Sequence, residues 1–455
     1  MRVSRLHVPG CKVRRLRRTC SLPPRNLPTC NLKTWRSRRS SFLAVLLSLL
    51  IASFPLPGMA QQESCVTCHQ ALEGRLSAPV KGMEADVHAK RGLGCSGCHG
   101  GDPKRIGMDA MDPRAGYLGA PKPADVPAFC GRCHSDPAFM RRYNPRMPTD
   151  QLAEFKTSVH GQRLARGDTK VATCTSCHGV HPVRAVTDPR SPVYATNIPE
   201  TCGRCHADPA YMKGYGIPTD QLSKYRRSVH GEALLQRGNR LAPACNGCHG
   251  NHGAVPPGVE SIANVCAQCH SATRDLFVKS PHKVAFDSMG LPECSTCHGN
   301  HEVAHPTDEM LGAGPQAFCT RCHEPGSKGL AAAQAMRASL EALKSRLEEA
   351  QALVSQAANA GVEMSEARLT LQEAQTRLIQ ARNVIHSFSP KQVEAVITEG
   401  LKFAEKGVAA GKAGLAEVRF RRRGLSIALV ILVGTAILLF LKVREMERQR
   451  MGPHP

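Results

Sequence analysis

Cysteine and histidine recur in one five-residue pattern, Cys-x-x-Cys-His, which occurs nine times between Cys65 and His323. The pattern is the attachment signature of c-type haem, because two thiols add across the vinyl groups of one porphyrin and the adjacent imidazole can bind its iron. Its cysteines are Cys65, Cys68, Cys95, Cys98, Cys130, Cys133, Cys174, Cys177, Cys202, Cys205, Cys245, Cys248, Cys266, Cys269, Cys294, Cys297, Cys319 and Cys322. Its histidines, the predicted proximal ligands, are His69, His99, His134, His178, His206, His249, His270, His298 and His323. The sequence therefore predicts nine covalently bound haem c groups.

Zinc sites and disulfides are the competing uses of these cysteines. Zinc sites also contain Cys-x-x-Cys pairs, but they do not require a histidine directly after the second cysteine. Disulfides are common in exported proteins, but disulfide bonding does not explain nine identical local spacings. We therefore expect haem at every copy of the motif.

Histidines outside the motifs recur in step with them. Some stand between paired motifs and others follow in His-Gly-x-His segments, which favours distal iron ligands over ordinary surface or core residues. They are His88, His160, His230 and His282, and then His181, His252 and His301. His305 and His386 are further candidates. Without His7 and His454, eighteen histidines remain for nine irons, so every haem could be bis-histidine; one haem with methionine or an open site is the alternative.

The motifs belong to internal repeats. Phe129 begins a segment that recurs from Thr201, an offset of 72 residues, and Pro-Thr-Asp-Gln-Leu and Ser-Val-His-Gly follow in both copies. A shorter third copy and a divergent first copy flank them, and the first has no trailing histidine near Gly101. Such repeats predict a linear array with contacts mainly between neighbours. Because aromatic residues make up only 4% of the chain, we expect a mainly α fold with much irregular loop, packed around porphyrins.

The net charge of +23 does not indicate a nucleic-acid partner. Residues 1–60 contain twelve Lys and Arg residues and no Asp or Glu, which leaves +11 for the rest. Each bis-histidine ferric haem adds about −1, so the mature protein is near neutral. Basic segments also lack the interleaved aromatic residues that nucleic-acid binding favours.

The N-terminal 60 residues are predicted to be a basic leader and a signal peptide. Arg36, Arg38 and Arg39 precede an apolar stretch, Phe42–Phe54, and a small-x-small cleavage site at Gly58–Ala60. The mature chain then begins near Gln61, outside the cytoplasm. We expect a nonahaem domain of two-haem repeats over 61–328.

A helical region and a membrane anchor are predicted after the motifs. Heptad-like leucines over 331–358, a second helix from Ser365 and a third from Pro390 give a helical hairpin plus one helix over 329–418. This region is a spacer, a self-association coil or a lid that donates His386. The apolar residues 424–441 predict a transmembrane helix, with 442–455 as a short cytoplasmic tail, because haem is attached outside.

The motif region, 65–323, resembles the periplasmic multihaem cytochromes c of bacterial respiration, including relatives of cytochrome c nitrite reductase and hydroxylamine oxidoreductase. The C-terminal helices with His386 are similar to those of the same superfamily. The resemblance implies electron transfer. The Cys-x-x-Cys-Lys motif of catalytic nitrite reductases is absent, since all nine motifs end in histidine.

Two hypotheses of function follow. The first is an electron-transfer subunit on the periplasmic face of the cytoplasmic membrane, which connects the quinone pool, through a quinone-reactive partner subunit, to periplasmic or outer-membrane acceptors. The second is a reductase of a small nitrogen or sulfur compound, such as nitrite or hydroxylamine, at one five-coordinate haem. It requires a missing distal histidine, and the first repeat and His305 are the places to look. A purely structural scaffold is disfavoured because haem is redox-active.

Overall fold

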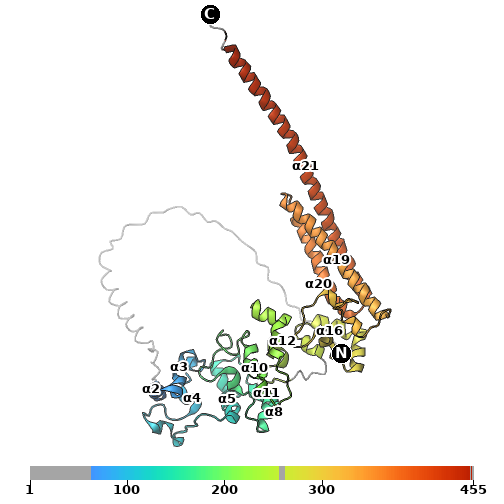
Figure 1. The fold of residues 1–455 in the computed structure, drawn as a ribbon. Helices are drawn as coiled ribbons and strands as arrows, with labels where there is room; N and C mark the ends of the chain where they lie inside the picture. Colours follow the sequence, from blue (N-terminus) through green and yellow to red (C-terminus); the bar gives the residue numbers. More distant parts are fainter. Residues whose placement is uncertain (1–62, 256–261, 451, 453–455) are drawn as a thin grey trace, which may run out of the picture. The chain divides into compact units, whose positions relative to one another are not determined.

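The computed structural model describes residues 63–255, 262–450 and 452, and every regular element among them is a helix (Figure 1). The predicted leader and signal peptide, residues 1–60, lie outside the described residues. The predicted mainly α fold with irregular loops and long C-terminal helices is confirmed.

Short helices joined by loops make up the motif region. The α-helices are α2 (Ser64–Gln70), α3 (Ala78–Gly82), α4 (Cys95–His99), α5 (Val126–His134), α6 (Pro137–Tyr143), α7 (Gln151–Thr157), α8 (Val159–Ala165), α9 (Cys174–His178), α10 (Ile198–His206), α11 (Pro209–Met212), α12 (Gln221–Arg227), α13 (Val229–Gly231), α14 (Cys245–His249), α15 (Ile262–Cys266), α16 (Ser271–Val278), α17 (Pro281–Met289) and α18 (Glu293–His298). Single turns of 3-10 helix are η1 (Gly74–Leu76), η2 (Met83–Ala85), η3 (Ala89–Arg91), η4 (Met108–Met111), η5 (Pro113–Ala115), η6 (Pro123–Asp125), η8 (Asp308–Met310), η9 (Cys319–Arg321) and η10 (Ile385–Ser387), and η7 (Glu232–Gln236) is a π-helical turn.

The repeats observed in the sequence fold in the same way. Asp136 and Asp208 each accept two backbone N–H bonds at the start of α6 and α11, where proline occupies the first position. Ser158 and Ser228 cap α8 and α13 in turn, by accepting the N–H of Gly161 and Gly231. Equivalent residues therefore hold equivalent turns in consecutive repeats.

Few side chains of the motif region form an apolar core. A small cluster of Tyr225, Leu234 and Ala244 is buried there, whereas most of the other buried apolar residues lie in the C-terminal helices. A region of this length normally buries many more large side chains. The motif region therefore depends on something other than its own side chains for packing, as expected of a haem protein.

Three long helices follow the motif region: α19 (Lys328–Asn359), α20 (Ser365–Val384) and α21 (Pro390–Arg450). The heptad leucines Leu340, Leu343 and Leu347 are buried between these helices. On α21 the facing positions are small, at Gly400, Ala404, Gly407, Gly411 and Gly414. Small residues at this spacing let two helix backbones approach closely, as in tightly packed helix pairs. The apolar face of α19 is therefore buried against α20 and α21 of the same chain.

The third helix and the apolar segment form one continuous helix. We expected separate helices over 390–418 and 424–441, but α21 runs unbroken through Arg419–Arg423 and Gly424. Arginine is a good helix former and one glycine is tolerated within a long helix, so nothing ends α21 at this point. Its C-terminal part is apolar and exposed, and it is the one candidate membrane span among the described residues.

The three helices α19, α20 and α21, with the turn η10, form a helical unit. This helical unit contacts the last repeat through several polar and aromatic groups. Arg382 donates two hydrogen bonds to the carboxylate of Asp308, at 2.9 and 2.7 Å. Thr273 of α16 donates to Asn383 at 2.6 Å. The ring of Phe388 lies 3.7 Å, centroid to centroid, from the ring of His282. These contacts fix the turn η10, which carries His386, against the repeat.

The close contact of α19 and α21 gives a first prediction. A Cβ at position 411 would lie 2.6 Å from the Cβ of Leu353 and 3.0 Å from its backbone carbonyl carbon, so Gly411→Ala must separate the two helices. We expect a loss of about 1–3 kcal/mol in unfolding free energy, measured by thermal unfolding followed by far-ultraviolet circular dichroism on the full detergent-solubilised chain.

Gly424→Ala is the matched control, because position 424 belongs to the same helix and has no atom within 4 Å of an added Cβ. Alanine there should leave stability unchanged or raise it by up to about 1 kcal/mol through helix propensity. Equal melting temperatures for the two variants would show that α19 and α21 are not in close contact at Gly411.

Candidate haem-binding sites

Each Cys-x-x-Cys-His motif lies on a helical turn. Seven copies are α-helical throughout, and in the remaining two the histidine N–H still donates to the carbonyl four residues back, from His270 to Cys266 and from His323 to Cys319, at 2.9 Å in both cases. Residues three and four apart share one face of a helix. The turn therefore presents two thiols and one imidazole on the same side, which is the arrangement that covalent haem attachment requires.

A glycine with positive φ follows several motifs and directs the chain toward the trailing histidine. Gly179, Gly250 and Gly299 have φ of 78°, 84° and 76°, a conformation that glycine adopts without steric cost. Each ends its motif helix, and the second histidine of His-Gly-x-His stands two residues later. This histidine therefore points away from the iron of its own motif.

Motif and non-motif imidazoles lie opposite each other in pairs. An iron held between two imidazoles by bonds of about 2 Å separates the ring centroids by about 6 Å, because each bonding nitrogen lies about 1 Å from its centroid. Eight such pairs occur among the described residues, with centroid distances from 5.9 to 6.3 Å. With the motif histidine first, they are His99–His181, His134–His88, His178–His252, His206–His160, His249–His301, His270–His230, His298–His386 and His323–His282. The space between each pair fits one iron atom.

The pairs connect different repeats. A histidine between two motifs faces a motif of the next repeat, as His160 faces His206. A trailing histidine faces a motif of the preceding repeat, as His252 faces His178. The backbone carries the same link, since the N–H groups of Val87, Val159 and Val229 donate to the carbonyls of Val183, Ala254 and Val303. Neighbouring repeats therefore complete each other's candidate sites.

The two ends of the array differ. At the eighth motif, which ends at His298, no further repeat supplies a trailing histidine. His386 of η10 faces His298 instead, with 6.1 Å between the ring centroids. At the first motif His69 makes no ring contact within the described part of the chain, and its Nδ1 lies 3.0 Å from the carbonyl of Leu76. His305 is exposed and is not brought to any motif imidazole described here; its Nδ1 lies 3.2 Å from the carbonyl of Pro306.

Hydrogen bonds at Nδ1 orient several of the paired rings. His99, His249 and His386 have Nδ1 within 2.9–3.0 Å of the carbonyls of Gly119, Val255 and Asn383. Because a carbonyl only accepts, Nδ1 must carry the proton in each case, which leaves the Nε2 lone pair of a neutral ring for a metal. Sequence analysis did not identify these partners, and no sequence pattern marks a backbone carbonyl.

Burial favours the neutral form of the paired imidazoles. Burial lowers the pKa of His160, His206, His298 and His386 below the usual value, and the facing imidazole lowers the pKa of His160 and His298 further. A neutral ring is the form that binds iron. These electrostatics therefore suit iron binding at the sites of His206 and His298.

The thiols of consecutive motifs also meet. Cys130 and Cys174, Cys202 and Cys245, and Cys266 and Cys294 share hydrogen bonds, so the pKa of the donor thiol is raised and that of the acceptor is lowered, for Cys266 to about 7. Thioether bonds to haem would remove these protons. The contacts place the attachment points of two motifs side by side, so porphyrins bound there would be neighbours.

One continuous cavity of about 3410 Å³ runs past the motif imidazoles of the third to ninth motifs. It is lined from Val87 to Phe388 and includes thiols of these motifs and Cys98 of the second motif. Planar, apolar macrocycles suit a cavity with these walls. The residues present in the second to ninth sites therefore fit haem c, which would supply one-electron redox chemistry.

The sequence analysis did not identify two contacts near the imidazoles. Asp86 lies against His88, and Phe388 packs on His282. For Asp86 a pattern existed, because Asp-Val-His stands where other copies have Ser-Val-His or Ser-Pro-His. For Phe388 none did, since it lies outside the repeats.

Comparisons with known proteins agree with these sites. Residues 87–207 match the family model described as Cytochrome c3, a range that holds the motifs ending at His99, His134, His178 and His206. A C-type polyheme cytochrome, OmcC of Geobacter sulfurreducens, is 26% identical over 118 residues, which is 25% of this chain and 14% of that protein. The chain thus matches only a small part of this relative. No solved structure matches it. With the motif repeats and the paired imidazoles, these similarities place the chain among the multihaem c-type cytochromes.

Proposed function

We propose that this chain conducts electrons along nine haems on the outer side of the cytoplasmic membrane. The observation that supports this proposal is the set of eight facing imidazole pairs. An iron with imidazole on both faces has no free position for a substrate, so it exchanges electrons and does little else. The eighteen motif cysteines hold the porphyrins, the motif histidines are proximal ligands, and the facing histidines are distal ligands.

The proposed route joins the quinone pool to periplasmic or outer-membrane acceptors through other redox proteins. One membrane-spanning helix offers no evident quinone site, so a quinone-reactive partner subunit is required. Haem attachment outside the cytoplasm then orients residues 442–455 inward. Adjacent motif thiols support transfer between neighbouring haems, because they bring consecutive porphyrins together.

The helical unit determines what the last haems can contact. Between Pro390, beside the last repeat, and Leu425, where the apolar segment begins, α21 has 35 residues and rises about 50 Å. The tip of the α19–α20 hairpin accompanies it, since Arg421 donates to the carbonyl of Gly361 at 3.5 Å. A quinone within the bilayer cannot contact the haems at His298 and His323 across that length. These haems exchange electrons with neighbouring haems or with a soluble domain of the partner.

Haem content and spin state test the proposal directly. Mass spectrometry of the purified chain should show nine haem additions, one for each motif. Ferric electron paramagnetic resonance should be dominated by low-spin signals, because eight irons have two imidazoles. Fewer than eight haems, or mainly high-spin iron in the native protein, would rule out the proposed conduit.

Substitution of one distal histidine should alter one haem. His160→Met replaces the ring that faces His206, and methionine ligation raises the haem potential, so about one ninth of the redox titration should move to higher potential. His305→Met is the matched control, because His305 faces no motif imidazole among the described residues. Identical titrations of both variants and the parent protein would exclude His160 as a ligand.

A second candidate function is reduction of a small nitrogen or sulfur compound at the first haem. The specific observation is His69, which makes no ring contact in the part of the chain that the structure describes. An iron ligated there on one face only would bind a small molecule at the other.

Carbon monoxide binding separates the two functions. We expect the reduced protein to bind about one carbon monoxide per chain, because one candidate site of nine has no facing imidazole among residues 63–255 and 262–450. Replacement of Cys65 and Cys68 by serine should abolish this binding, whereas serine at Cys95 and Cys98 should not. No binding by the parent protein would eliminate the reductase function and leave the conduit intact.

A further inference from the structure

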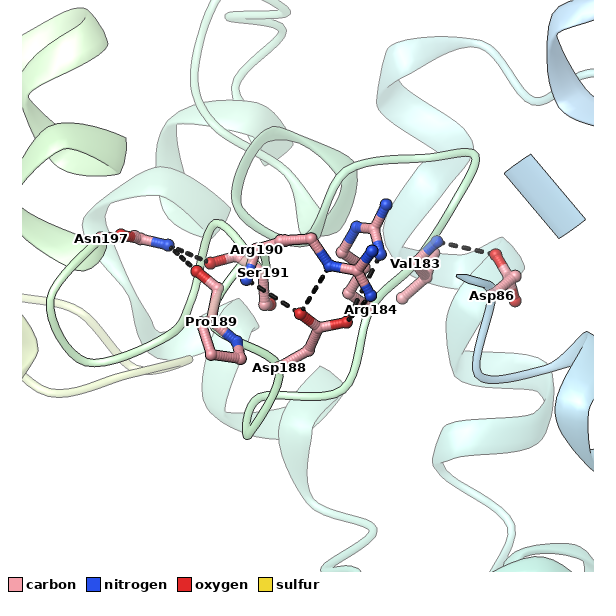
Figure 2. Close-up of polar contacts among 8 residues, drawn as sticks. All are labelled: Asp86, Val183, Arg184, Asp188, Pro189, Arg190, Ser191 and Asn197. Carbon is pink, nitrogen blue, oxygen red and sulfur yellow. Dashed lines mark hydrogen bonds and ion pairs between the residues drawn. The ribbon is translucent and has the colours of Figure 1, made fainter. Parts of the chain in front are cut away.

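Asp86 is a buried carboxylate beside one of the paired imidazoles. It is 7% exposed, and its Oδ1 lies 3.2 Å from Nδ1 of His88 and accepts the backbone N–H of the same residue at 2.8 Å. Its Oδ2 accepts the backbone N–H of Val183 at 2.7 Å (Figure 2). Because a carboxylate only accepts, Nδ1 of His88 is the donor.

The loop that follows Val183 is closed by its own hydrogen bonds, and Val183 itself is hydrogen-bonded to residues 86 and 87. Asp188 accepts hydrogen bonds from Arg190 at 2.9 Å and Arg184 at 3.4 Å, and Asn197 donates to the carbonyl of Pro189 at 2.7 Å (Figure 2). Val87 donates to the carbonyl of Val183 at 2.9 Å. Residues 86–88 and Val183 are therefore joined in both directions, and Asp86 has little freedom to turn away.

The other repeats have serine at the position of Asp86. Ser158 donates to the carbonyl of Phe155 at 2.6 Å and accepts the N–H of Gly161 at 2.9 Å. Ser228 repeats both bonds, and Ser280 donates to the carbonyl of Phe277. Ser158 and Ser228 thus cap helices, and among the described residues none of the three serines has a hydrogen bond to an imidazole. In the last copy Nδ1 of His282 is buried with no hydrogen-bond partner among the described residues.

A carboxylate at Nδ1 changes what the imidazole does to an iron at Nε2. It draws the Nδ1 proton, which makes the ring a stronger electron donor, and second-shell carboxylates act on metal-bound histidine in this way. A stronger donor and a nearby negative charge both stabilise ferric over ferrous iron. The effect is large where the carboxylate is buried, because water does not screen it.

We propose that Asp86 is a positioning residue that gives the haem between His88 and His134 a lower potential than those between His160 and His206, His230 and His270, and His282 and His323. The inference rests on the proposed ligation of these irons. Ligand type cannot give the four haems different potentials, since all have two imidazoles. The difference between the repeats at this position is the carboxylate of Asp86. At equilibrium this haem is therefore reduced less readily than those three. The charge also acts on the adjacent haem, because Val183 follows the distal candidate His181 by two residues.

Reciprocal exchange of the repeat residues tests this inference. Asp86→Ser gives the first copy the residue of the others, and Ser158→Asp does the reverse. The backbone permits the exchange, since φ and ψ are −76° and 134° at Asp86 and −66° and 157° at Ser158. Spectropotentiometric titration should show about one ninth of the signal shifting to higher potential in Asp86→Ser, with a smaller shift in the same direction at the haem of His181, and about one ninth shifting to lower potential in Ser158→Asp. Asp86→Asn, which keeps an acceptor but loses the charge, should shift in the direction of Asp86→Ser.

Control variants distinguish the possible failures. Asp188→Asn weakens the loop without touching Asp86, and it should leave all potentials unchanged; a shift equal to that of Asp86→Asn would make the role of Asp86 structural. If Asp86→Ser fails to mature with all its haems, Ser158→Asp and Asp86→Asn still show whether a carboxylate at this position lowers the haem potential. His88→Met should raise one potential if His88 is a ligand. A shift in His88→Met together with unchanged potentials in Asp86→Asn and Ser158→Asp would overturn the inference and leave the proposed function intact.

Discussion

An iron held between two imidazoles needs two rings about 6 Å apart on a common axis, and the rest of this structure depends on that constraint. A single motif on one helical turn supplies only one ring. The second must come from elsewhere in the chain, and here it comes from a neighbouring repeat. The short helices, glycine turns and backbone links between repeats all serve to hold these second rings opposite the first.

Under the proposed ligation, exchange of imidazoles between repeats would make the stability of each repeat depend on its neighbours. In most repeat proteins a unit is stabilised by contact with its neighbours, whereas here each unit would also bind its neighbours' metals. A trailing histidine faces a motif of the preceding repeat. Among the described residues no motif stands before Cys65, so a trailing histidine near Gly101 would have no motif to face. At the other end His386 has the role of a trailing histidine without belonging to a repeat.

The sequence predicted the types of residue in the sites but not their pairing. Nine motifs and seven recurring histidines follow from spacing alone, and so does the helical, loop-rich fold. The register was not predictable, because a histidine between two motifs faces neither of them: His160 stands between His134 and His178 in the sequence but faces His206. His305 and His386 each occur outside the repeated pattern, so the repeats could not show which of them faces a motif. Only the position of η10 against the last repeat shows that it is His386. Residues 419–424 also gave no sign of continuous helix, because a cluster of charge beside an apolar segment marks a membrane boundary and not a helix end.

Helix α21 joins the last repeat to the candidate membrane span as one continuous element, and its small-residue face packs on α19 and α20. Glycine lowers helix propensity by about 1 kcal/mol per residue relative to alanine, and α21 carries four buried glycines between Gly400 and Gly414. Close packing on α19 and α20 must offset that cost, and it does so over the same span that separates Pro390 from the apolar segment. A flexible tether would have anchored the chain equally well. A packed three-helix unit instead fixes the separation between His386 and the apolar segment of α21, and the lower helix propensity of the glycines is the cost of that close packing.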